Sequence, residues 1–159
     1  MNTIKPIWQA LMIGAIAGMR AAYAPALISH ILNTKKSKRL TYSPIRFVES
    51  DAFANTTKVF ALGELIGDKL PATPARIEPT GVVARCVSGS FSGVAFAKAK
   101  GDNVAVAALL STTAALASTF LCYYLRKKLV KEIGVADPWI GALEDSIVIG
   151  SGIALIQSA

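Results

Sequence analysis

The sequence predicts an all-α protein, folded as a polytopic integral membrane bundle of four to five hydrophobic helices. Hydrophobic residues make up 53% of the 159 residues, and the mean hydropathy is +0.48. Charged residues make up only 17%, whereas soluble domains average about 25%. Several apolar runs also approach about 20 residues, the length that a helix needs to cross a bilayer. We therefore expect one transmembrane helical domain over residues 1–159.

The first hydrophobic segment, residues 7–32, is expected to form a single membrane-crossing helix. Arg20 lies inside it, and Pro25 should kink it because proline lacks a backbone N–H group. A cleaved signal peptide is the alternative, since Lys5 precedes the apolar run and residues 22–24 (Ala-Tyr-Ala) resemble a cleavage site. Pro25 directly after that site and Arg20 before it argue against cleavage, so we predict a retained span.

The second segment, residues 53–70, is only weakly apolar. A charged helix is a poor lipid-facing span. The segment is therefore either a helix that the others shield from lipid or a re-entrant segment that lines a cavity. Its four charged residues are Lys58, Glu64, Asp68 and Lys69.

Three further helices are expected at residues 81–97, 104–125 and 138–157. The segment 104–125 is the clearest span, because it has no charged residue and ends in two tyrosines followed by Arg-Lys-Lys. The last helix should begin with Asp137 as its N-cap and Pro138 as its first residue.

Basic residues gather beside the apolar runs, which suits cytoplasmic loops of a bacterial inner membrane and not a nucleic-acid surface. If all five segments cross, the flanking loops hold equal numbers of Lys and Arg: Lys35, Lys36, Lys38, Arg39, Arg46, Lys98 and Lys100 against Lys5, Lys69, Arg76, Arg126, Lys127, Lys128 and Lys131. If residues 53–70 do not cross, the basic loops fall together, and the positive-inside rule favours this second arrangement.

Small residues suggest where the helices pack. Three GxxxG motifs occur, at Gly14 and Gly18, Gly63 and Gly67, and Gly89 and Gly93. Helices in lipid have no hydrophobic drive to associate, so small residues that permit close backbone contact matter more. These glycines either pack the helices of one chain or help form a homodimer.

Charged residues inside the apolar segments are the candidate functional residues. A charge at the bilayer centre costs at least about 2.5–3.5 kcal/mol, so the two arginines should pair with acids on other helices. The set is either a polar pathway or a structural network that fixes helix register. Its members are Arg20, Glu64, Asp68, Lys69, Arg85, Glu144 and Asp145.

No residue pattern indicates catalysis, a metal site or a cofactor. Cys86 and Cys122 lie in apolar runs without a nearby Cys or His partner, so free thiols are expected. His30 is the single histidine and should be an interfacial side chain. We therefore predict a protein that is not an enzyme.

Several short motifs occur in order along the chain. They are Gly18-Met19-Arg20, Glu64 followed by Asp68-Lys69-Leu70-Pro71, the approach from Arg76 to Pro79 and Gly81, and Leu143-Glu144-Asp145. This order resembles the bacterial membrane family catalogued as domain of unknown function 4126. In the family pattern the arginine and proline are adjacent, whereas Ile77 and Glu78 separate them here. The resemblance implies a small multi-span membrane protein and supplies no substrate.

A short internal similarity pairs residues 61–66 (ALGELI) with residues 142–147 (ALEDSI). Inverted repeats with acidic, broken helices occur in transporters, although a similarity of this length also arises by chance. The leading hypothesis is thus a transporter or channel-like protein for an ion or small polar solute. The alternative is a non-transporting scaffold or accessory subunit, and an intramembrane enzyme ranks third.

Overall fold

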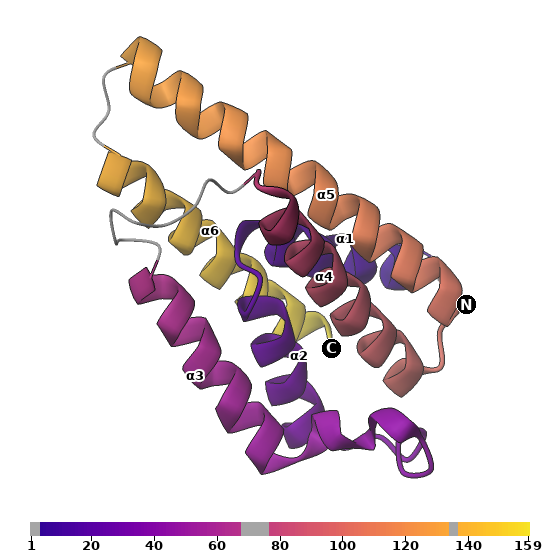
Figure 1. The fold of residues 1–159 in the computed structure, drawn as a ribbon. Helices are drawn as coiled ribbons and strands as arrows, with labels where there is room; N and C mark the ends of the chain where they lie inside the picture. Colours follow the sequence, from indigo (N-terminus) through magenta and orange to yellow (C-terminus); the bar gives the residue numbers. More distant parts are fainter. Residues whose placement is uncertain (1–3, 68–76, 134–136) are drawn as a thin grey trace.

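The computed structural model describes residues 4–67, 77–133 and 137–159, and within these ranges every regular element is a helix (Figure 1). This confirms the all-α prediction. The elements are α1 (Ile4–Met19), α2 (Tyr23–Thr34), the 3₁₀-helix η1 (Pro44–Glu49), α3 (Asp51–Gly67), α4 (Pro79–Lys100), α5 (Val104–Lys128), the π-helical turn η2 (Leu129–Ile133) and α6 (Asp137–Ser158).

The single helix expected over residues 7–32 is wrong. The chain leaves helical structure after Met19 and resumes it at Tyr23, so α1 and α2 are separate helices. Pro25 does not kink a continuous helix. It lies in the first turn of α2, where its missing N–H group would have no helical acceptor. The break therefore lies upstream of the proline, at Arg20–Ala22.

α1 and α2 form a helical hairpin, because the end of α2 returns to the end of the bundle where α1 begins (Figure 1). Near the start of α1, the Gln9 side chain contacts both Ser158 and Lys100, at the ends of α6 and α4. Just after α2, the Ser37 hydroxyl donates to the carbonyl of Ala99, also at the end of α4. We call this end of the bundle the open end of the hairpin, and Arg20–Ala22 the hairpin tip.

The remaining helices differ from the expected ranges mainly at their ends. α3 begins two residues before the expected 53–70 segment, and residues 68–70 lie outside the described part of the chain. α4 extends the expected 81–97 segment at both ends, and α5 continues to Lys128 before the π-helical turn. α6 begins at Asp137, one residue before the expected 138–157 helix.

Small residues bring α1, α4 and α5 into close contact at the centre of the bundle. A Cβ atom added to Gly14 would lie 2.1 Å from the backbone oxygen of Ser111, and one added to Gly18 would lie 2.3 Å from that of Ala115. Gly89 and Gly93 of α4 lie against the same stretch of α5, between Ala107 and Ala115. Four of the six glycines named from the sequence therefore lie at interhelical contacts.

Hydroxyl groups of α5 reinforce this contact by donating to carbonyl groups of α1. Ser111 donates to Ala10 at 3.0 Å, Ser118 to Ala15 at 3.0 Å and Thr119 to Gly18 at 3.2 Å. Ser118 and Thr119 each lie about two turns beyond Ser111 on α5, so the three bonds fix the register of α5 against α1.

Gly63 makes no close contact with another described helix. No described atom lies within 4 Å of a Cβ atom added there, because Gly63 faces outward while its neighbour Glu64 faces α2. Adjacent helical residues point about 100° apart, so they cannot share one face. Gly67 is the last residue of α3, and its surroundings lie outside the described part.

The contrast between Gly14 and Gly63 gives a matched stability test. Gly14→Ala should lower the free energy of unfolding by about 1–3 kcal/mol, because the added methyl group overlaps the backbone of α5. Gly63→Ala should raise it by about 0.5–1 kcal/mol, because alanine favours the helix and nothing obstructs it. Thermal unfolding of the purified protein in detergent, followed by circular dichroism, measures both. Equal shifts for the two variants would contradict the packing described here.

Candidate functional site

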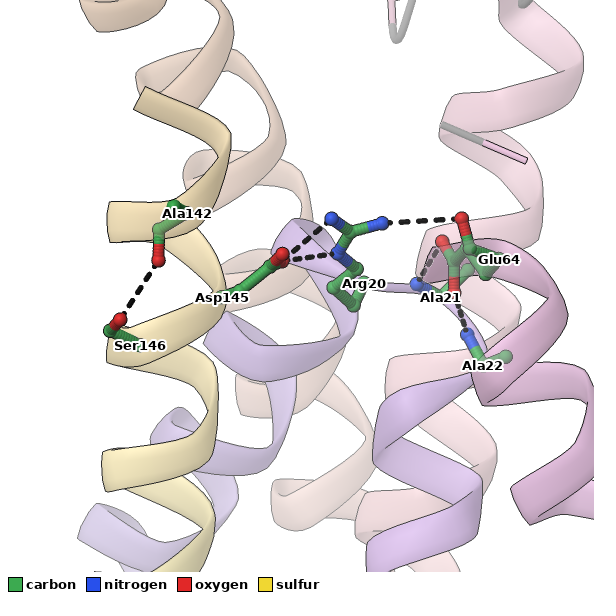
Figure 2. Close-up of polar contacts among 7 residues, drawn as sticks. All are labelled: Arg20, Ala21, Ala22, Glu64, Ala142, Asp145 and Ser146. Carbon is green, nitrogen blue, oxygen red and sulfur yellow. Dashed lines mark hydrogen bonds and ion pairs between the residues drawn. The ribbon is translucent and has the colours of Figure 1, made fainter. Parts of the chain in front are cut away.

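The Glu64 carboxylate caps the N-terminus of α2 (Figure 2). Its two oxygens accept from the backbone N–H groups of Ala21 at 2.9 Å and Ala22 at 2.7 Å. Ala22 is the N-cap residue of α2 and Ala21 precedes it, and among the described residues no backbone carbonyl accepts from either amide. A negative charge is also favourable there because of the helix dipole. Glu64 of α3 thus satisfies both groups from a different helix.

Arg20 links the hairpin tip to α6. Its Nη2 and Nε atoms donate to one carboxylate oxygen of Asp145, at 2.6 and 3.0 Å (Figure 2). Its Nη1 atom donates to the backbone carbonyl of Glu64 at 3.3 Å. The Arg20 side chain is 6% exposed and that of Asp145 is 20% exposed. The guanidinium therefore bridges α6 and α3 in a largely buried place.

The other two long helices also contact the chain beside the tip. The Ser88 hydroxyl of α4 donates to the Ala21 carbonyl, and the Thr119 hydroxyl of α5 donates to the Gly18 carbonyl. Side chains from α3, α4, α5 and α6 thus hold the five residues between Gly18 and Ala22. We refer to Arg20, Glu64 and Asp145 as the tip cluster.

A groove of about 570 Å³ begins at the tip cluster and runs between α2, α3 and α6. Arg20 and Asp145 line one part of it, and His30 and Lys58 line another. Most of the remaining wall is apolar: Ala26, Leu27, Ala61, Leu62, Leu65, Val148, Ile149 and Ile156. A polar cluster is therefore open to an apolar groove on one side.

The structure brings together three of the seven charged residues named from the sequence, namely the members of the tip cluster. Arg85 and Glu144 are each 7% exposed, so they are also buried. Asp145, which is less deeply buried than Glu144, pairs with Arg20. The remaining two of the seven, Asp68 and Lys69, lie outside the described part of the chain, as does Arg76.

Sequence reasoning missed the backbone groups at the tip, because it assumed a continuous helix there. The amides of Ala21 and Ala22 become free to bind Glu64 only when the helix is broken. The one available signal was Pro25, which is favoured in the first turn of a helix. Nothing in the sequence singles out Ser88, whose partner is also a tip backbone group.

The charges of the tip cluster do not sum to zero. Arg20 carries one positive charge, whereas Glu64 and Asp145 carry two negative charges when ionised. The cluster then has a formal charge of −1, so one further positive charge would balance it. Among the described residues, no group of three His, Cys, Asp or Glu side chains is close enough to hold a metal ion.

Comparison with known proteins adds no family or function to this geometry. No protein-family model, no curated protein and no solved structure matches the chain. The resemblance to the family catalogued as domain of unknown function 4126 therefore stays a prediction.

The Arg20–Asp145 pair can be tested by a double-mutant cycle. Arg20→Met and Asp145→Leu should each lower the free energy of unfolding by about 3–5 kcal/mol, because each leaves one buried charge without its partner. The double variant should lose clearly less than the sum of the two single losses. Chemical denaturation in detergent measures all four proteins. Additive losses would mean that the two side chains do not interact in solution.

Proposed function

We propose that the protein is a multi-pass protein of the inner (plasma) membrane that moves a proton or a small cation through the tip cluster. The observation that carries the proposal is the broken helix α1–α2, whose tip gathers Arg20, Glu64 and Asp145 within an apolar bundle. Broken helices with charged groups near the bilayer midplane are a common construction of ion sites in transporters.

Membrane insertion is supported by the apolar outer surface of the bundle. Within the described ranges, two helices are long and apolar enough to cross a membrane by themselves, at residues 104–132 and 139–158, and 28% of the most apolar stretch of each is buried. Such helices also form the cores of soluble proteins, but a core helix is mostly buried. Large apolar side chains are exposed on several other helices as well, including Trp8, Val59, Phe60, Ile66, Val83 and Val87. Patches of this extent suit contact with lipid.

The lengths of the helices suggest that the α1–α2 hairpin is re-entrant. α1 and α2 have 16 and 12 residues, fewer than the roughly 20 that a full crossing needs, whereas α3 has 17, at the lower end of the length that can cross. Thr119, which contacts Gly18, lies about 22 Å along α5 from Val104 and about 13 Å from Lys128, at 1.5 Å per residue. In this proposal the hairpin, and not the 53–70 segment, enters and leaves on one side.

Charge distribution favours a cytoplasmic location for the open end of the hairpin. Among the described residues, eight Lys and Arg lie at that end and four lie at the other: Lys5, Lys35, Lys36, Lys38, Arg39, Arg46, Lys98 and Lys100 against Arg126, Lys127, Lys128 and Lys131. The positive-inside rule places the richer end in the cytoplasm.

The charge and position of the tip cluster support a positively charged substrate. Intramembrane carboxylates commonly mark proton relays and cation pathways. The tip cluster has a formal charge of −1 when Glu64 and Asp145 are both ionised, so one proton or monovalent cation would neutralise it.

A scaffold without transport is the second candidate, and one observation favours it. Both oxygens of the Glu64 carboxylate are already bonded to amides, and Arg20 is bonded to Asp145 and to a carbonyl. A fully bonded cluster suits a structural clamp.

The homodimer expected from the sequence also stays a prediction, with the open face of α3 at Gly63 as its candidate contact.

Cysteine labelling tests the proposed topology. In a chain with Cys86 and Cys122 replaced by alanine, Lys5→Cys and Tyr42→Cys should react with an impermeant maleimide from the same side of the membrane. Lys127→Cys should react from the opposite side. If Lys5→Cys and Tyr42→Cys were labelled from opposite sides, residues 4–34 would cross the membrane and the hairpin would not be re-entrant.

Flux measurements test transport. Proteoliposomes containing the wild type should dissipate a proton, Na⁺ or K⁺ gradient, and Glu64→Gln and Asp145→Asn should each reduce the rate at least tenfold. Each substitution removes one negative charge of the cluster without changing its size. Glu132→Gln, on the exposed π-helical turn, is the matched control and should retain the wild-type rate. A folded wild type without flux of any of these ions would favour the scaffold.

A further inference from the structure

The groove between α2, α3 and α6 has properties that ion transport does not require. Eight of its thirteen lining residues are Ala, Leu, Val or Ile, and these side chains bind neither protons nor cations. Its volume of about 570 Å³ falls within the roughly 300–1,000 Å³ of pockets that enclose a small molecule. The shape and chemistry of the groove therefore suit an apolar chain.

Two basic side chains stand along the same groove. Lys58 is exposed and forms no ion pair with another described residue. His30 is also exposed and lies across from it on α2, where Ser29 and Thr57 share a hydrogen bond. Among the described lining residues Asp145 is the one acid, and it is already paired with Arg20. The outer part of the groove is thus complementary to an anion.

The positions of these groups match the orientation of a lipid. Lys58 lies about 9 Å from Glu64 along α3, towards the open end of the hairpin, at 1.5 Å per residue. Lysine side chains also extend their charged ends towards the head groups. From Asp145 to Ile156 the α6 wall is about 16 Å long, close to half of the roughly 30 Å hydrocarbon core.

We infer that the groove binds one acyl chain of an anionic phospholipid from the leaflet at the open end of the hairpin. The phosphate lies at Lys58 and His30, and the chain extends between α3 and α6 towards the tip cluster. Anionic lipid on the cytoplasmic side also agrees with the basic residues gathered at that end. The inference uses the proposed membrane placement but not ion transport.

Native mass spectrometry of the full chain in detergent tests this site. Phosphatidylglycerol and phosphatidylcholine with identical palmitoyl chains are titrated separately. The wild type should bind phosphatidylglycerol at least fivefold more tightly. Lys58→Gln should remove most of this preference, whereas Lys127→Gln, an exposed lysine at the other end of the bundle, should retain it.

A second variant tests the position of the acyl chain. Ala61→Trp places a large side chain on the α3 wall of the groove and should lower phosphatidylglycerol binding at least fivefold. Circular dichroism checks that each variant remains folded, and Lys58→Gln changes only an exposed side chain. Equal affinity for the two lipids, or unchanged binding by Lys58→Gln or Ala61→Trp, would overturn the inference. Lipid binding in detergent involves no ion flux. If the lipid does not bind as expected, the transport proposal is therefore unaffected and is decided by the flux measurements alone.

Discussion

The two backbone amides and the guanidinium at the hairpin tip need polar partners inside an apolar bundle. Buried amides and charges without hydrogen bonds cost several kcal/mol, so the break between α1 and α2 persists only if other helices supply those partners. Glu64 meets both amides, and Asp145 meets Arg20. The positions of α3 and α6 follow from this requirement, because each must bring one carboxylate to the same five-residue stretch. The fold can therefore be understood as a broken helix with its partners arranged around it.

The helices form two groups that differ in how they contact the hairpin: α4 and α5 in one group, and α3 and α6 in the other. Glycines and hydroxyl groups fix α1 against α4 and α5 at short backbone distances. In contrast, α3 and α6 meet the hairpin through polar groups at the tip and through apolar side chains such as Val148 and Leu155, which are buried in the core, and they leave a groove between them. Their antiparallel segments ALGELI and ALEDSI place Glu64 and Asp145 at equivalent positions, on two sides of Arg20 (Figure 2).

The sequence was sufficient to predict the helical class and the approximate helix positions after residue 50, because apolar runs and charged or proline-rich connectors mark them directly. It also identified Arg20, Glu64 and Asp145 as buried charges, since charges within apolar runs must find partners. The broken first helix was not predictable from composition alone. A continuous apolar run from Ile7 to Leu32 looks like one span, and the break is stabilised by Glu64, which is 42 residues beyond Ala22. Likewise, the glycine spacing on α3 could not show that Gly63 faces away from other helices.

The distance in sequence between Arg20 and Asp145 has a consequence for biosynthesis. The two residues are 125 positions apart, and α6 leaves the ribosome after the other described helices. Because the ribosome adds about 5–20 residues per second, Asp145 is synthesised about 6–25 s after Arg20. During that interval the nascent hairpin has a positive charge at its tip that is not yet neutralised by α6. Stable packing of the hairpin in the bundle is therefore a late step of folding. A chain truncated before Asp145 would expose this charge to the cell's quality-control machinery.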